Sequence, residues 1–129
     1  MAPLSLLIVL LTVMLMFWTI MRVGRARGRY QIHAPAVSGH PDFERVYRVQ
    51  MNTLEQVAMF LPTFVIAAQY GDALWANALG ASWLLGRAWY VIAYSRAANK
   101  RGPAFILGML AWFGLLLLAF WGVGRLLLA

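Results

Sequence analysis

Four long apolar stretches alternate with short polar segments along the chain. Residues 3–21 and 103–124 carry no charged side chain, and residues 51–70 and 73–95 are nearly as apolar. Each stretch matches the roughly 20 residues that an α-helix needs to cross the hydrocarbon core of a bilayer. The pattern therefore predicts an all-α integral membrane protein, in which residues 1–129 form a single domain with four transmembrane helices.

Local signals place the ends of these helices. Pro41 suits the first position of a helix, and the acidic residues just after it favour the positive end of the helix dipole. Only two residues separate the second and third apolar segments, so these two helices should form an antiparallel hairpin. Residues 24–40 contain glycine, proline and arginine without a period, and we expect them to be irregular. The expected helices cover about residues 3–23, 41–70, 73–96 and 103–126.

The composition agrees with a membrane protein. Of 129 residues, 63% are hydrophobic and 12% are charged, whereas about a quarter of the residues of a soluble domain are charged. The first apolar segment could also be a secretory signal peptide, which begins with basic residues and ends at a small-residue cleavage site. Here the start is not basic and arginines follow the segment, so we expect a retained transmembrane helix.

The formal net charge of +7 raises the question of nucleic acid binding. The basic residues, however, gather in or beside the two loops that follow the first and third helices, which favours a membrane interpretation. The positive-inside rule then places both loops in the cytoplasm and both termini on the opposite side. The chain has no cysteine and two histidines, so we expect neither a disulfide framework nor a metal cluster. The basic residues concerned are Arg22, Arg25, Arg27, Arg29, Arg45, Arg48, Arg87, Arg96, Lys100 and Arg101.

Two polar faces interrupt the apolar helices. The second helix carries Arg45, Arg48, Asn52 and Glu55 within about 80° of one another. The third helix carries Arg87, Tyr90 and Tyr94 at positions i, i+3 and i+7. Exposing a charge to lipid costs about 2.5 to 3.5 kcal/mol near the bilayer centre. Both faces should therefore point to protein or to a water-filled pocket near the cytoplasmic boundary.

Two interpretations of these faces stay open. In the first, Glu55 pairs with an arginine and Asn52 bonds across helices, which is a purely structural network. In the second, the arginines outnumber the single acid at membrane level because a small ligand with several carboxylates joins them. Glu55 would then bind an ammonium group of the same ligand. Headgroup anchoring by Arg48 and an interfacial position of the tyrosines are the simpler alternatives for those residues.

Two sequence segments resemble the MAPEG superfamily, the membrane-associated proteins in eicosanoid and glutathione metabolism. They are "ERVYRVQMNTLE", residues 44–55, and "RAWYVIAYSR", residues 87–96. The resemblance implies a homotrimer that binds glutathione as co-substrate between neighbouring subunits near the cytoplasmic face. It also implies a lipophilic electrophile, or a lipid, as the second partner.

The resemblance further implies the roles of particular residues. The candidate glutathione-binding residues are Arg27, Arg48, Gln50, Asn52, Glu55, Arg87, Tyr90 and Tyr94. The resemblance implies all of them except Arg87, which belongs to the polar face of the third helix. Arg101 matches the arginine that stabilises the thiolate, although a shorter turn leaves Lys100 as an alternative. The chain departs from the family pattern at Gln56, a tyrosine position, and at Gly28, an arginine position for which Arg25 and Arg29 are candidate substitutes.

The resulting hypothesis is a glutathione-dependent transferase or peroxidase that serves detoxification. Lowering the pKa of a thiol by two units from its ordinary 8.5 needs about 2.7 kcal/mol, which one charge-assisted hydrogen bond can supply. The alternative is a non-catalytic protein of the same fold that binds lipid or glutathione. A proton-coupled drug exporter is disfavoured, because such exporters need an acid in the first helix and residues 3–21 contain none.

Overall fold

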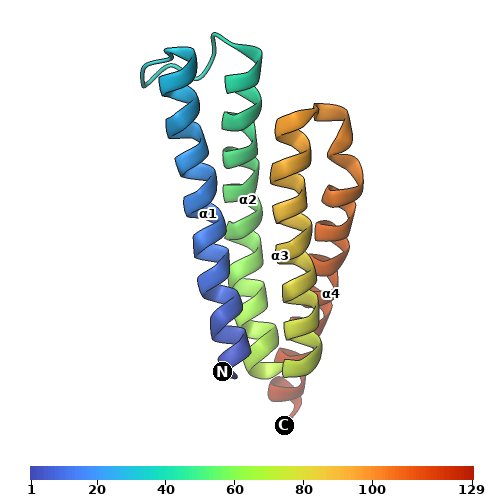
Figure 1. Ribbon diagram of the computed structural model, residues 1–129. Coiled ribbons are helices and arrows are strands. Elements are labelled where there is room, and N and C mark those ends of the chain that lie inside the picture. The colour runs from blue at the N-terminus through green and yellow to red at the C-terminus, as the bar shows by residue number, and fades with distance from the viewer.

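The computed structural model describes the backbone of residues 1–129 and every side chain except that of Ala98. Within this part, the regular structure is helical. It comprises α1 (Pro3–Tyr30), α2 (Pro41–Tyr70), α3 (Ala73–Arg96), the short 3₁₀ helix η1 (Ala98–Lys100) and α4 (Gly102–Leu128) (Figure 1).

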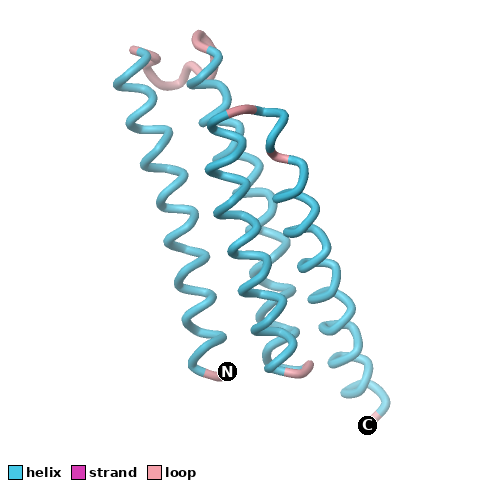
Figure 2. Tube along the Cα trace, turned by 45° about the vertical axis from the view of Figure 1, so that its right-hand side comes forward, coloured by secondary structure: helices cyan, strands magenta, loops and turns pink.

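The four α-helices run antiparallel in chain order and form one bundle. Both termini and the turn between α2 and α3 lie at one end, whereas the α1–α2 and α3–α4 connections lie at the other (Figure 2). We call this second end the basic end, because the arginines of the last turns of α1, the first turns of α2 and the α3–α4 connection lie there. Helices α2 and α3 each pack against both α1 and α4, and α1 and α2 extend beyond the other two helices at the basic end (Figure 1).

Three helices, α1, α2 and α4, are long and apolar enough to cross a membrane. Helix α3 is not one of these three, and it carries Asn77 and Arg87, which the bundle buries to 8% and 1% exposure. Since α2 and α4 run in the same direction, the chain must return through the same thickness by way of α3. Large apolar side chains such as Leu110 and Phe120 remain exposed on the outer faces. The chain is thus an all-α membrane bundle of four helices, as the sequence predicts.

Helix α1 is longer than predicted and ends at Tyr30 instead of residue 23. The expectation of an irregular chain from residue 24 was therefore wrong for its first seven residues. Each helical glycine costs about 1 kcal/mol relative to alanine, but Val23 and Ala26 bury their side chains against Phe43 of α2, and the arginines of the last turn favour the negative end of the helix dipole. This burial, which only the tertiary fold creates, keeps the segment helical.

Close packing joins α3 to α4. A Cβ atom on Gly86 would lie 3.2 Å from the backbone nitrogen of Gly108, so a side chain there would force the two helices apart. In the core between α2 and α3, the rings of Phe60 and Trp83 stack with centroids 3.8 Å apart. This contact fixes the polar faces of α2 and α3 next to each other.

Candidate functional site

A cavity of about 480 Å³ opens at the basic end of the bundle. We call it the α2 cavity, because one face of α2 forms most of its wall. Its volume lies within the range of roughly 300 to 1,000 Å³ that is typical of small-molecule sites. The lining residues are Val37, Ser38, Glu44, Tyr47, Arg48, Met51, Asn52, Glu55, Tyr90 and Arg101.

Helical spacing explains why α2 contributes so many of these residues. Arg48, Asn52 and Glu55 follow one another at i, i+4 and i+7, so their side chains leave α2 on the same side. Arg48 and Glu55 are exposed within the chain, and a ligand can therefore reach them. The fourth residue of this predicted face, Arg45, does not line the cavity and pairs with Asp42 instead.

Arg87 lies behind the wall of the cavity. Its side chain is 1% exposed, and its guanidinium donates hydrogen bonds to Asn52 Oδ1 at 3.0 Å and to Thr53 Oγ1 at 2.9 Å. The prediction that the third-helix face borders a polar pocket is met by Tyr90, but Arg87 is enclosed by protein and is not among the lining residues. Burial is the physical reason, since the buried guanidinium takes its acceptors from α2.

The bond from Arg87 determines how Asn52 is presented. A guanidinium can only donate, so the side-chain oxygen of Asn52 must face Arg87. The amide NH₂ group of Asn52 is then the part free to face the cavity. Its two N–H donors suit an anionic oxygen of a ligand.

Four side chains of the third and fourth helices form a ladder of rings and guanidinium groups. The guanidinium carbon of Arg87 lies 4.0 Å from the ring centre of Tyr90, the rings of Tyr90 and Tyr94 stack at 5.6 Å, and the guanidinium carbon of Arg101 lies 5.1 Å from the ring centre of Tyr94. Tyr90 lines the cavity, whereas Tyr94, 5% exposed, supports Arg101 from behind.

Arg101 reaches the cavity from the start of α4. It is the N-cap residue of that helix, where the helix dipole adds positive potential. Lys100, the predicted alternative, lines a different pocket together with Arg96. Of these three basic residues, Arg101 alone lines the α2 cavity.

Besides the buried Arg87 and Tyr94, two further residues of the predicted site lie outside the α2 cavity. Arg27 donates to the backbone oxygens of Ile32 at 3.3 Å and Ala36 at 2.7 Å, which holds the loop after α1. Gln50 lies about 160° from Arg48 around α2 and is half-buried on the other side. Within one chain, neither residue lines this cavity.

The two departures from the family pattern also lie away from the cavity. Gln56 is 8% exposed and lies within the bundle. The candidate substitutes for the arginine missing at position 28, Arg25 and Arg29, line a separate pocket on α1. They therefore do not replace that arginine within the same chain.

The charges of the α2 cavity are more balanced than the sequence suggested. Its lining includes two arginines and two glutamates. The sequence had predicted several arginines around a single carboxylate, and that prediction overstated the excess of positive charge. Among the described side chains, the ion pair is Arg45 with Asp42. Neither Glu44 nor Glu55 forms an ion pair with an arginine in the described structure, which contradicts one part of the structural interpretation, the pairing of Glu55. Its other part is confirmed, since Asn52 accepts a hydrogen bond from Arg87 of the neighbouring helix.

Some lining residues were not predicted. Glu44, Tyr47 and Met51 lie on the same face of α2 as Arg48, and helical geometry could have identified all three. Val37 and Ser38 belong to the irregular loop after α1, where no periodic signal exists. Their position depends on how the loop folds back over α2.

Comparison with known proteins gives a consistent result. The model of the MAPEG family matches residues 5–121. An uncharacterized protein of Synechocystis is 50% identical over 105 residues, which cover 81% of this chain and 77% of that protein. Human microsomal glutathione S-transferase 2 is 42% identical over 98 residues, which cover 74% of this chain and 67% of the relative. Leukotriene C4 synthase of Cavia porcellus is 35% identical over 120 residues, with 92% and 78% covered.

Proposed function

Because this chain belongs to the MAPEG family, we propose that it is a membrane enzyme that conjugates the thiolate of glutathione to a lipophilic electrophile. The observation that carries the proposal is the α2 cavity. It brings Arg48, Asn52, Glu55, Tyr90 and Arg101 together from three separate helices or helix ends. The relative from Homo sapiens is named as a glutathione S-transferase, which supports the same class of reaction.

The chemistry of glutathione complements this set of side chains. Glutathione carries two carboxylates, one ammonium group and one thiol. The fork of Arg48 and the NH₂ group of Asn52 suit carboxylates, because both offer donors to anionic oxygens. Glu55 suits the ammonium group, since no arginine of the described structure neutralises it.

Arg101 is the proposed stabiliser of the thiolate. A free thiol with a pKa near 8.5 is mostly protonated at neutral pH, and an adjacent guanidinium favours the charged form. A hydrogen bond to a charged group contributes about 1.5 to 3 kcal/mol, which covers the roughly 2.7 kcal/mol of a two-unit shift. The thiolate sulfur then forms a bond to the electrophilic carbon of the acceptor, and the leaving group departs with its electron pair. Tyr90 also lines the cavity, although it is only 2% exposed, and its hydroxyl is the proposed second donor.

Arg27 and Gln50 bear on the proposed assembly. Neither lines the cavity of its own chain, which favours a contribution to glutathione binding from a neighbouring copy. We therefore keep the homotrimer as part of the proposal, with each ligand between two subunits. Both connections lie at one end of the bundle (Figure 2), and the arginines of α1, α2 and the α3–α4 connection gather there. The positive-inside rule therefore supports a cytoplasmic site and termini on the opposite side.

The central experiment replaces Arg101 by alanine and uses Lys100→Ala as the matched control. We expect Arg101→Ala to slow conjugation of a chlorinated nitrobenzene about 100-fold, which corresponds to 2.7 kcal/mol. The ultraviolet absorbance of the bound thiolate should also disappear, whereas glutathione binding remains measurable by titration calorimetry. Lys100→Ala should resemble the wild type.

Three results would contradict parts of this proposal. Unchanged conjugation in Arg101→Ala would refute the role of that residue. Failure of the wild type to bind glutathione would refute the function itself. Binding without a thiolate signal or conjugation would identify a non-catalytic glutathione-binding protein.

A further inference from the structure

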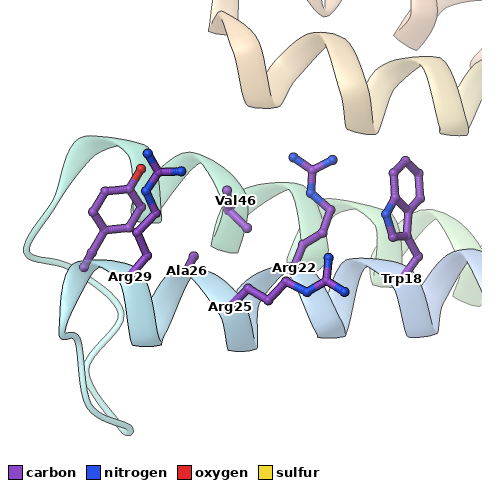
Figure 3. Close-up of a pocket in the computed structure, with 7 residues that line it drawn as sticks. Trp18, Arg22, Arg25, Ala26, Arg29 and Val46 are labelled. Atoms are coloured by element: carbon purple, nitrogen blue, oxygen red, sulfur yellow. The ribbon is translucent and has the colours of Figure 1, made fainter.

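A second cavity lies on α1 at the basic end of the bundle. It has a volume of about 330 Å³, and we call it the α1 pocket. Figure 3 shows Trp18, Arg22 and Arg29 rising from the same side of α1, with Val46 of α2 beside them. The lining residues are Trp18, Arg22, Arg25, Ala26, Arg29, Tyr30 and Val46.

The α1 pocket is separate from the α2 cavity. No residue lines both. At 100° per residue, Arg22, Arg25 and Arg29 fall within about 60° of one another around α1. Arg27, the residue implied to bind glutathione, points about 140° to 160° away from them. The three arginines therefore form a face that the proposed reaction does not use.

The charge of this pocket is of one sign. Three guanidinium groups line it, and no acidic side chain does. The ion pair in the described structure joins Arg45 to Asp42, so the three arginines are not neutralised by a carboxylate of the chain. Like charges on adjacent helical turns repel one another, and an anion between them would remove this repulsion.

Aromatic rings border the charged groups. The guanidinium carbon of Arg22 lies 5.4 Å from the ring centre of Trp18, and that of Arg29 lies 5.5 Å from the ring centre of Tyr30. Tryptophan and tyrosine are the residues that concentrate at membrane–water interfaces. The pocket thus has the side chains expected at the level of lipid headgroups.

An apolar track continues from the pocket toward the centre of the membrane span. Leu7, Leu11 and Met14 lie on the same face of α1 as the arginines, and they are 49%, 43% and 61% exposed. Free phosphate would gain nothing from these side chains, whereas acyl chains would cover them. The combination of a basic pocket and an apolar track therefore favours a lipid over a soluble anion.

We propose that the α1 pocket binds the phosphate group of an anionic membrane phospholipid. Guanidinium forks donate to the phosphate oxygens in a bidentate manner, and basic pockets at helix ends are suited to anionic headgroups. The acyl chains lie along Leu7, Leu11 and Met14. This site is independent of the proposed reaction with glutathione.

The test counts lipids bound to the full-length protein in neutral detergent by native mass spectrometry. The probes are phosphatidylglycerol and phosphatidylcholine with identical acyl chains, and inorganic phosphate serves as competitor. The test variant combines Arg22→Gln, Arg25→Gln and Arg29→Gln. The control variant combines Arg96→Gln, Lys100→Gln and Arg125→Gln, which removes the same charge outside the pocket.

We expect phosphatidylglycerol to bind more tightly than phosphatidylcholine and the test variant to lose about 100-fold in affinity, at about fivefold per arginine. The control variant should bind like the wild type. Should the triple variant fail to fold, Arg25→Gln alone, at an exposed position, should still lose about fivefold. The affinity for glutathione should be the same in the test variant and the wild type.

Each of the opposite results would overturn the proposal. Equal binding of the two lipids would remove the case for an anionic headgroup, and equal losses in the test and control variants would show a general charge effect. Full displacement by inorganic phosphate would identify a soluble-anion site. A loss of glutathione affinity in the test variant would show that the pocket belongs to the glutathione site.

Discussion

The α1 pocket and the α2 cavity lie at the same end of the bundle but differ in the charges that line them. The α2 cavity combines two arginines with two glutamates and a half-buried asparagine, whereas the α1 pocket has three arginines and no acid. A lining of both signs suits a zwitterionic peptide, which offers both signs in return. A lining of one sign suits a phosphate group.

The two regions also differ in how firmly their polar groups are held. Beneath the α2 cavity, Arg87 bonds to two side chains of α2 and contacts the ring of Tyr90. In the α1 pocket, cation–π contacts with neighbouring residues support Arg22 and Arg29. Pre-positioned donors favour a reaction that needs fixed geometry, whereas arginines held only by cation–π contacts are sufficient for a headgroup.

Replacing Arg87 by leucine should have the largest effect, because it removes the hydrogen bonds that hold the polar groups of the α2 cavity in place. The change leaves the acceptors of Asn52 and Thr53 without a donor inside the bundle, which costs about 1 to 3 kcal/mol for each unsatisfied group. We expect a loss of about 3 kcal/mol in the free energy of unfolding and about a 100-fold loss of glutathione affinity. Thermal unfolding and titration calorimetry measure the two quantities.

The matched control for this variant is Arg125→Leu, which changes an exposed arginine at the opposite end and should affect neither quantity. Arg87→Lys should be intermediate, because it keeps the charge but loses the planar fork. A normal glutathione affinity in Arg87→Leu would show that Asn52 needs no support from Arg87.

Glu55→Gln should weaken glutathione binding about tenfold, since the pair with the ammonium group is lost and a charge-assisted bond contributes about 1.5 kcal/mol. Phosphatidylglycerol binding should not change. Calorimetry with glutathione and with its deaminated analogue provides the measurement. The analogue should bind equally well to the variant and the wild type, and any difference between them would assign Glu55 another role.

Salt should change the affinities of the two sites to different extents, and this is the smallest of the expected effects. Raising the ionic strength from about 0.1 M to about 1 M shortens the Debye length from about 10 Å to about 3 Å. Phosphatidylglycerol should then bind roughly fivefold more weakly, because three unneutralised arginines attract it, whereas glutathione should lose less than twofold in a balanced cavity. Equal salt dependence at both sites would remove the distinction between them.

The sequence predicted the parts of the site that depend on one helix. The four apolar stretches indicated the bundle, since their length alone matches a membrane crossing. The spacing of Arg48, Asn52 and Glu55 indicated a shared face of α2, because side chains three and four residues apart leave a helix on the same side. Both conclusions need only local geometry.

Other features could not be predicted, because they depend on contacts between helices. The extension of α1 to Tyr30 depends on burial against Phe43, and the enclosure of Arg87 depends on acceptors that α2 provides. The separation of Arg101 from Lys100 depends on how η1 turns into α4.

The amino-acid sequence by itself thus determined the class of the fold, the polar faces of its helices and the chemistry available at the basic end, because hydrophobic period and residue type are local properties. Only the tertiary structure decided which arginines share a cavity, which ones are buried behind it, and which ones form the separate α1 pocket. The reason is that the rotation of each helix about its axis is set by packing against its neighbours, and a sequence read one helix at a time does not contain that angle.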